Sequence, residues 1–148
     1  MNFRLIIDEE KPEEVVVTAH APSELIRRIE DLVRESDGKD RICGYDSEKD
    51  EIRMLSFSRI QCITVQGGKT YAIDAGGIRY RLKQRLYELE AIVPSYFIRI
   101  NKSAIANEKA IERFSATYSG AVDAVFRCGY REYVSRRCFA QIKRRFET

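Results

Sequence analysis

The stretch Phe97–Ile111, with the sequence FIRINKSAIANEKAI, indicates more about the fold than any other part of the chain. It begins as a strand and passes a tight basic turn at Asn101–Ser103. A short apolar turn, Ala104–Asn107, then leads into another strand. We therefore expect a basic turn that neighbouring strands hold in place.

A second basic corner lies near the C-terminus at Tyr133–Arg137, with the sequence YVSRR. Two fixed basic turns on a small β-rich scaffold suit a reader of duplex nucleic acid, because backbone amides and Ser, Asn, Lys and Arg side chains donate hydrogen bonds to phosphates. Ordinary solvated turns contain the same residue types. The bare chemistry leaves both interpretations open.

Length and composition bound the class of protein. The 148 residues predict one domain, or one domain with a short appendage, and the 44% of hydrophobic residues allow an ordinary core. No apolar run approaches the roughly 20 residues of a membrane span. The start of the chain, Met1–Arg4, lacks the charged-then-apolar pattern of a signal peptide. These features predict a cytoplasmic protein.

The net charge of +3 is unevenly distributed along the chain. Residues 1–55 carry 9 Lys and Arg against 15 Asp and Glu, whereas residues 56–148 carry 17 against 8. An acidic N-terminal third before a basic remainder suggests a polyanion-binding domain with an arm of different purpose. A chance fluctuation of surface charge is the alternative.

The sequence offers little for metal binding. The four cysteines, Cys43, Cys62, Cys128 and Cys138, form no CxxC pair, and His20 is the only histidine, so no structural zinc site is expected. Cys128, with arginines nearby, is either an activated thiol or, more simply, a free cysteine near a turn.

Catalysis is not supported either, because no Ser/His/Asp set is evident. Gly67–Thr70, GGKT, resembles the tail of a nucleotide-binding loop, but its spacing differs and it falls in an expected hairpin. Glu88 and Glu90 lie on opposite faces of an expected helix and are interpreted as solvated charges. We expect no enzyme activity, no catalytic residue and no cofactor.

The N-terminal region predicts a small unit with two strands and a helix. Phe3–Ile7 and Glu14–Thr18 are strand-like, and a polar segment with Pro12 separates them. A helix opens at Ser23 and ends at Ser36–Gly38. One face of this helix is apolar, with Leu25, Ile29, Leu32 and Val33. Because the unit is short for an independent domain, we expect it to pack on the rest of the chain or on a partner subunit.

From residue 41 the pattern changes to strands. The expected strands are 41–45, 51–56, 59–66, 69–74, 96–100, 111–118, 121–127 and 130–134. Gly67–Gly68 is expected to close a tight hairpin. Four apolar positions predict a helix that ends before Pro94, namely Leu82, Leu86, Leu89 and Val93. A basic helix over 136–146 closes the chain, with Phe139, Ile142 and Phe146 facing inward.

Three turns supply candidate contacts to nucleic acid: Gly67–Thr70, Asn101–Ser103 and Ser135–Arg137. Arg and Lys at such turns bind phosphate or reach guanine, and Asn pairs with adenine. An RNA-binding module is an alternative, because aromatic side chains can stack on single-stranded bases. The aromatic residues in question are Tyr71, Tyr80, Tyr96, Phe97, Tyr130 and Tyr133. In alternating strands such residues more often fill the core.

These residues resemble a known family. The run FIRINKSAIAN resembles the signature of the LytTR DNA-binding domain, in which a strand, a basic turn with Ser and a small apolar turn ending in Asn recur. The run YVSRRCFAQIKRRF is similar to that family's closing strand and helix. RLKQRLYELEAIVPSYF and SFSRIQCITVQGGKTYAID are similar to its preceding elements. The resemblance covers about Ile52–Phe146, with four consecutive elements in order.

The resemblance implies an elongated, mainly β fold with short helices, and a regulator that binds promoter DNA. Loops of such domains enter successive major grooves of a bent duplex, often at paired sites about one turn, ~10 bp, apart. The matching positions imply base contacts from Lys102 and Arg137, with Lys69 near a loop that also reads bases. The residues that would support these contacts or bind phosphate are Asn101, Ser103 and Arg136. For Arg99, on the strand before the turn, a structural role is the alternative.

Some positions depart from the family's pattern. Asn101 stands where His is common, which leaves the base preference there open, and Cys138 stands where an aromatic residue usually follows the double Arg. Gly67–Gly68 makes a short first loop. Many relatives carry a receiver domain with a phosphoacceptor aspartate, and residues 1–50 are too few for one. We therefore expect no control by phosphorylation of that type.

Together these patterns divide the chain into an N-terminal αβ arm, residues 1–45, and a LytTR-like DNA-binding domain, residues 46–148. The arm is expected to form a homodimer or to dock a partner, such as a membrane protein that restrains the regulator. The predicted function is a dimeric, cytoplasmic, sequence-specific transcriptional regulator that binds double-stranded promoter DNA. An RNA-binding module and a protein-interaction domain that has lost DNA binding are the alternatives.

Overall fold

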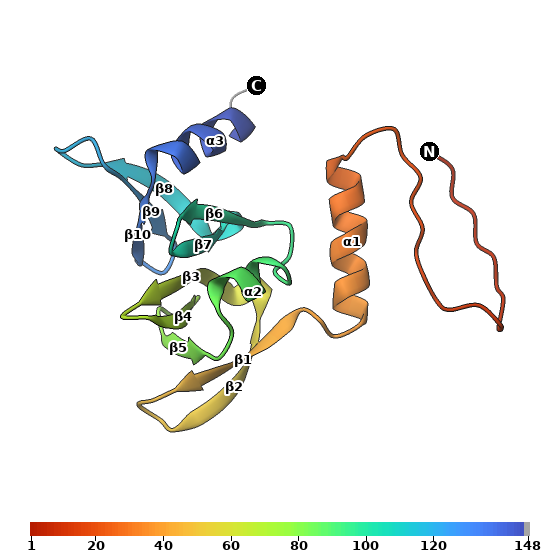
Figure 1. The fold of residues 1–148 in the computed structure, drawn as a ribbon, viewed down its shortest axis with the longest axis horizontal. Helices are drawn as coiled ribbons and strands as arrows, with labels where there is room; N and C mark the ends of the chain where they lie inside the picture. The colour runs from red at the N-terminus through yellow and green to blue at the C-terminus, as the bar shows by residue number, and fades with distance from the viewer. Residues whose placement is uncertain (147–148) are drawn as a thin grey trace.

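The computed structural model describes residues 1–146, and within them the chain is mostly β-sheet with three α-helices (Figure 1). The helices are α1 (Glu24–Ser36), α2 (Leu86–Glu90) and α3 (Arg136–Phe146). The strands are β1 (Arg41–Asp46), β2 (Glu51–Ser56), β3 (Ile60–Gln66), β4 (Lys69–Asp74), β5 (Arg79–Leu82), β6 (Phe97–Asn101), β7 (Ala104–Asn107), β8 (Ile111–Ala116), β9 (Val122–Phe126) and β10 (Arg131–Val134). None of the helices in this range is both long and apolar enough to cross a bilayer.

The strands form two antiparallel sheets. The larger has the order β2-β1-β5-β4-β3-β7-β6, and the smaller has the order β10-β9-β8. β10 and α3 both lie against β6, the edge strand of the larger sheet. The smaller sheet and α3 therefore cover one end of the larger sheet, and the basic turns that follow β6 and β10 come close together.

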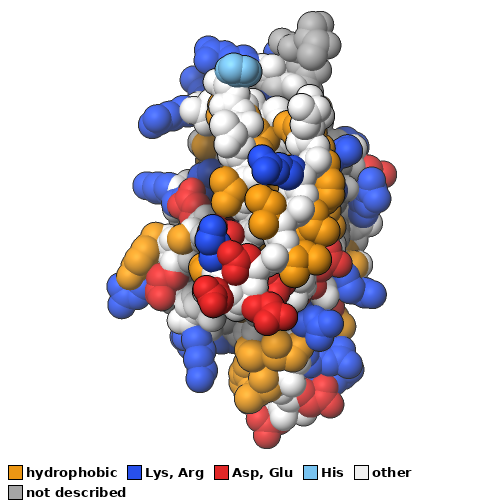
Figure 2. Space-filling model, turned by 90° about the vertical axis from the view of Figure 1, so that its right-hand side faces the viewer, with side chains coloured by type: hydrophobic (Ala, Val, Ile, Leu, Met, Phe, Trp, Pro, Cys, Tyr) orange, Lys and Arg blue, Asp and Glu red, His pale blue; other side chains and the backbone are white. Residues whose placement is uncertain are grey.

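The N-terminal part of the chain before β1, residues 1–40, stands beside the sheets, and many of its large apolar side chains are exposed (Figures 1 and 2). The expected helix is confirmed as α1, whose first turn is capped by Ser23 Oγ, which accepts a hydrogen bond from the Ile26 amide at 3.4 Å. The two expected strands, Phe3–Ile7 and Glu14–Thr18, do not form: both segments lack strand pairing. The prediction of an αβ arm was wrong in its β part, because a strand requires a partner backbone and the described chain supplies none.

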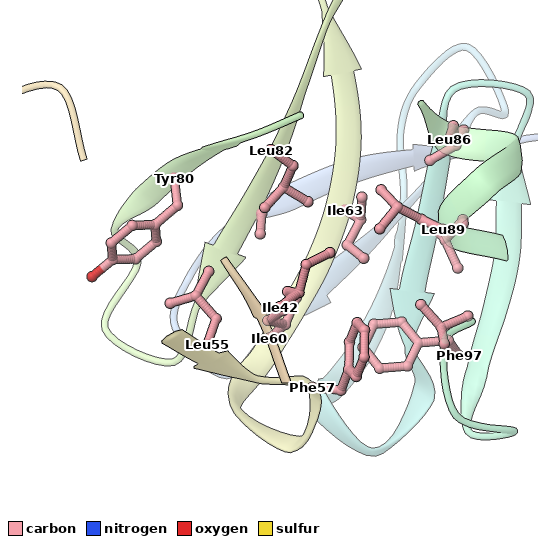
Figure 3. Packing of buried hydrophobic residues seen from close by; sticks show 13 residues of the cluster. Ile42, Leu55, Phe57, Ile60, Ile63, Tyr80, Leu82, Leu86, Leu89 and Phe97 are labelled. Carbon is pink, nitrogen blue, oxygen red and sulfur yellow. The ribbon is translucent and has the colours of Figure 1, made fainter. Parts of the chain in front are cut away.

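Two apolar cores lie on opposite faces of the larger sheet. On β7, Ile105 belongs to the first core, whereas Ala104 and Ala106 belong to the second. The first core joins Phe57, Ile63, Tyr80, Leu82, Phe97 and the α2 residues Leu86 and Leu89 (Figure 3). The second joins Cys62, Ile98 and Ile100 to Ala124, Phe126, Val134 and Ile142 of the smaller sheet and α3.

This double burial explains one wrong expectation. Ala104–Asn107 was predicted as an apolar turn, but it is strand β7, with all four residues buried. A strand that is covered on both faces shows no alternation of apolar and polar residues, so its sequence does not reveal it as a strand.

The helix expected over Leu82–Val93 is shorter than predicted. Leu82 belongs to β5, where it pairs with Thr70 of β4. α2 begins only after Arg85, whose backbone amide donates to Glu88 Oε1 at 3.1 Å. The four apolar positions mimic a helical repeat because Leu82 and the α2 leucines enter the same core.

The closing helix is confirmed as α3. Ile142 is buried and Phe139 is partly buried in the second core. The Phe146 side chain and residues 147–148 lie outside the described part of the structure.

Candidate nucleic-acid interface

The two basic turns predicted from the sequence line one groove of about 600 Å³. Lys102 comes from the turn between β6 and β7, and Arg137 comes from the first turn of α3. A backbone hydrogen bond from the Ser135 amide to the Ile100 carbonyl, 2.9 Å, ties the end of β10 to β6. This bond brings together two segments that are distant in sequence.

Asn101 fastens the first turn from inside. It is buried, with 7% of its surface exposed. Its side-chain amide donates to the Tyr133 carbonyl at 2.6 Å, and its Oδ1 accepts from the Ser103 amide at 2.7 Å. Since both ends of the amide are used within the protein, Asn101 shapes the turn and joins it to β10.

Arg99 fastens the same turn from the other side. Its Nε donates to the Asn101 carbonyl at 2.9 Å, and its Nη2 donates to the Lys102 carbonyl at 2.7 Å. Its Nη1 donates to Glu90 Oε2 of α2 at 3.0 Å. The Arg99 guanidinium therefore holds the backbone of the turn by hydrogen bonds, while the Lys102 side chain remains exposed.

Ser135 organises the second turn. Its hydroxyl accepts from the Cys138 amide at 3.2 Å, and its carbonyl accepts from the Phe139 amide at 2.8 Å. A serine that accepts from the amide three residues ahead is a favoured start for a helix. Arg136 and Arg137 follow directly and are exposed.

Gln141 also lines the groove, and the sequence interpretation missed it. It lies four residues after Arg137 on α3. Because residues four apart share a helix face, this spacing was the signal that could have identified it.

Lys69 is the first residue of β4, directly after the β3–β4 turn and outside the groove. The turn before it places Gly67 and Gly68 at φ values of 59° and 76°. Positive φ at both central residues is the requirement of a tight hairpin turn, and it explains the glycine pair. The Val65 amide donates to the Ser103 carbonyl at 2.8 Å, so the β3–β4 hairpin adjoins the Lys102 turn.

A second basic residue stands near this hairpin and was also missed. Arg79 of β5 donates from Nη1 to Gln66 Oε1 at 3.2 Å, and its guanidinium lies 4.2 Å from the centre of the Tyr71 ring. Only the register of β4 against β5 brings Arg79 to this place, so the sequence carries no local signal for it.

In the described part of the chain, ion pairs do not neutralise the candidate cations at or beside the three turns. Within residues 1–146, Lys69, Lys102, Arg136 and Arg137 take part in no ion pair, whereas Arg99 is paired with Glu90. Exposed unpaired cations attract a polyanion and release its counterions on binding. The groove and the hairpin beside it can therefore bind phosphates.

A polar cluster lies under the hairpin and supports it. Thr64 Oγ1 donates to Glu132 Oε1 at 2.5 Å, and the Tyr130 hydroxyl donates to the same oxygen at 3.1 Å. Burial, and then the charge of Glu132, raises the pKa of Tyr130. Gln66 Nε2 donates to the Tyr130 hydroxyl at 3.5 Å, which connects the cluster to the end of β3.

Several of the aromatic side chains considered for base stacking are instead packed in or against the protein core. Tyr80 and Phe97 are buried in the first core. Tyr96 packs against that core, and burial raises its pKa to about 12. Tyr133, which is 49% exposed and lines the groove, is the member of the set best placed to meet a ligand.

The cysteines do not gather into a site. Cys62 is buried, and burial raises the pKa of its thiol. Cys128 and Cys138 are partly buried and Cys43 is exposed. In the described part of the chain, no three His, Cys, Asp or Glu side chains are grouped so that they could hold a metal ion.

Comparison with known proteins identifies the family. The LytTr DNA-binding domain matches residues 50–147. Two Staphylococcus aureus proteins named as uncharacterized HTH-type transcriptional regulators, from strains MSSA476 and NCTC 8325 / PS 47, are each 31% identical over 147 residues, which are 98% of this chain and 97% of theirs. The fold is similar to the solved LytTr DNA-binding domain of a putative methyl-accepting/DNA response regulator from Bacillus cereus, with a TM-score of 0.64 at 20% identity, over 74% of this chain and 98% of that one. This protein therefore belongs to the LytTr DNA-binding domain family.

Proposed function

We propose that this protein is a sequence-specific transcriptional regulator that reads the major grooves of promoter DNA with loop residues. The observation that carries the proposal is the shared groove, in which Lys102 and Arg137 stand exposed and have no ion-pair partner among residues 1–146. Membership of a DNA-binding family supports the DNA duplex as ligand. The relatives named as transcriptional regulators support the role, and none of these similarities points to an enzyme.

In this proposal Lys102 and Arg137 contact base edges, and Lys69 contacts the duplex from the neighbouring hairpin. Ser103 and Arg136 bind phosphates, and Asn101 acts from inside by shaping the turn. Loops fit this role better than helices here, because strands β6 to β10 separate α2 from α3. A helix-turn-helix pair needs two helices joined by a short turn.

The regulation that we propose does not use a phosphorylated receiver domain. We divide the chain into an arm, residues 1–45, and a DNA-binding domain, residues 46–148, with β1 at their junction. The regulator is proposed to act in the cytoplasm as a homodimer. A membrane protein that restrains it is a second candidate partner, which co-purification from solubilised membranes would test.

Selection of random DNA duplexes by the purified protein at about 0.15 M salt tests the function, since long-range charge attraction is largely screened there. We expect enrichment of two related short motifs about one helical turn, ~10 bp, apart. The same selection with Lys102→Ala should relax the preference at one position of each motif. Recovery of sequences without enrichment, or better competition by single-stranded RNA than by duplex DNA, would overturn the proposal.

A further inference from the structure

The first twenty residues hold two extended segments, residues 3–7 and 14–18, that pair with no strand in the described part of the chain. Within residues 1–146, the backbone amides and carbonyls of residues 3–7 and 14–18 make no hydrogen bond to another backbone group. Both segments run along the outside of α1 (Figure 1). An extended segment with unpaired amides and carbonyls is a template for adding a strand from another chain.

Most of the large apolar side chains of these two segments are exposed to solvent. Six large apolar residues are between 61% and 92% exposed: Phe3, Leu5, Ile6, Ile7, Val15 and Val16. Figure 2 shows apolar side chains gathered along the face that the arm presents. Contiguous exposed apolar patches of this kind mark interaction surfaces in soluble proteins.

The second segment of the arm lies against helix α1. Val15 and Val17 line a hollow against Ile26, Ile29 and Val33 of α1.

The other side of α1 is tied to the β-sheet domain. Arg34 Nη1 donates to the carbonyls of Ile92 and Val93 at 3.0 and 2.9 Å, and Ser95 Oγ donates to Asp31 Oδ2 at 2.9 Å. The second segment therefore lies over α1, and the first segment, Phe3–Ile7, is left as the outer edge.

We propose that the partner of this edge is a second copy of the chain, paired antiparallel across a two-fold axis at Phe3–Ile7. The charges of the segment favour its own copy: the N-terminal amine and Arg4 lie at one end, and Asp8, Glu9 and Glu10 lie at the other. Antiparallel pairing sets the basic end of each copy beside the acidic end of the other. A uniformly acidic or basic partner would match only one end.

The exposed apolar area of the arm approaches what a stable dimer needs. Leu25 and Leu32 of α1 are also 49% and 64% exposed, which makes eight large apolar side chains per copy. Burial of one such side chain removes roughly 60–120 Å² of apolar surface from water. Because these eight side chains are between 49% and 92% exposed, they supply roughly 350–700 Å², which is most of the ~800 Å² per partner of a standard interface.

This interface supplies the contact surface of the homodimer named under the proposed function. The inference rests on the proposed function for the homodimer itself. The relatives from S. aureus match 98% of this chain, so the match extends into the arm as well as the DNA-binding domain. A two-fold dimer would present two copies of the groove to paired DNA sites.

Light scattering on the full-length protein without DNA tests the interface. Leu5→Lys places two like charges opposite one another at the centre of the proposed pairing and removes apolar area, so we expect a dimeric wild type and a monomeric variant. Because Leu5 is 72% exposed, the substitution should leave circular dichroism and thermal unfolding of the monomer unchanged. Leu5→Ile, which keeps the apolar area, should remain dimeric.

Ile52→Lys is the matched control. Ile52 is 76% exposed and lies on β2, the other edge strand of the larger sheet. The Ile52→Lys variant should remain dimeric. If Ile52→Lys dissociates the dimer and Leu5→Lys does not, the interface lies at β2 and the proposal is wrong. A monomeric wild type would also overturn it and would leave the arm to a different partner.

DNA binding separates this proposal from the proposed function. Lys102→Ala should remain dimeric and relax the base preference at one position of each motif. Leu5→Lys should keep the full base preference and bind a paired site with the affinity of a single site. A dimer that binds no specific duplex would overturn the function and leave the interface standing.

Discussion

The β-sheet domain and the N-terminal arm contain similar strand-like sequences with opposite outcomes. Ile60–Gln66 of β3 is paired on both sides, by β4 and β7, and its first five residues are buried. Val15–Val17 of the arm has the same β-branched character, yet it has no strand partner within residues 1–146. The difference shows that apolar, β-branched residues favour a strand only where another backbone completes the ladder.

The largest effect should come from the core of the β-sheet domain. Phe57 is 1% exposed and meets Phe97 edge to face, with ring centres 5.9 Å apart. Phe57→Ala should lower the free energy of unfolding by about 3–5 kcal/mol, as measured by urea unfolding followed by tyrosine fluorescence. Phe3→Ala, at a residue 92% exposed, should change it by less than about 0.5 kcal/mol at concentrations where the chain is monomeric. Equal losses would mean that the arm shares the core.

Removal of the exposed cations should separate binding from stability. Lys102→Ala and Arg137→Ala should each weaken specific DNA binding by about 1–3 kcal/mol and reduce its salt dependence, as measured by fluorescence anisotropy. Both substitutions should leave the free energy of unfolding nearly unchanged, as Phe3→Ala in the arm should, because these side chains are exposed. Lys49→Ala, in the turn between β1 and β2, is the control for a cation outside the groove. A loss that is equal for every DNA sequence would reduce both residues to phosphate contacts.

Arg99 should affect both stability and DNA binding, because it holds the backbone of the Lys102 turn and also lines the groove. Arg99→Met removes the bonds to two backbone carbonyls and Glu90, and should cost about 1–2 kcal/mol of stability, since the side chain is one-third exposed and water replaces part of the loss. DNA binding should weaken as well. Arg113→Met, which breaks an exposed ion pair with Glu112, should cost less than about 0.5 kcal/mol. Arg99→Met with unchanged DNA affinity would show that the turn keeps its shape without this clamp.

The smallest effect at neutral pH should come from Tyr130. The pKa of Tyr130 is raised in the folded protein above the value of about 10 in the unfolded chain, so the folded state binds this proton more tightly. Its contribution to stability is therefore complete below pH ~10 and is lost above it. Tyr130→Phe should cost about 1 kcal/mol at pH 7 and should make the alkaline fall of stability shallower. The remaining fall belongs to the other groups with raised pKa values, among them Tyr96, whose pKa burial raises to about 12, and the buried thiol of Cys62. An unchanged slope would contradict the role given to Tyr130.

Much of the domain was predictable because its signals are local. Gly67–Gly68 and the capped helices follow from glycine at positive φ and from serine at a helix start. β7 was not predictable, because burial on both faces removes the alternation that marks a strand. The strand content of the arm was overestimated, because strand propensity cannot show whether a partner is present.

The candidate site divides in the same way. The sequence by itself determined which turns are basic and, through the run FIRINKSAIAN, which family they resemble. Only the tertiary structure placed Lys102 and Arg137 in one groove, assigned Arg99 and Asn101 to the backbone of the turn, and added Gln141 and Arg79 to the surroundings. Turn chemistry depends on neighbours in the chain, whereas a shared groove depends on the pairing of distant strands, and that pairing is fixed by the packing of the whole core.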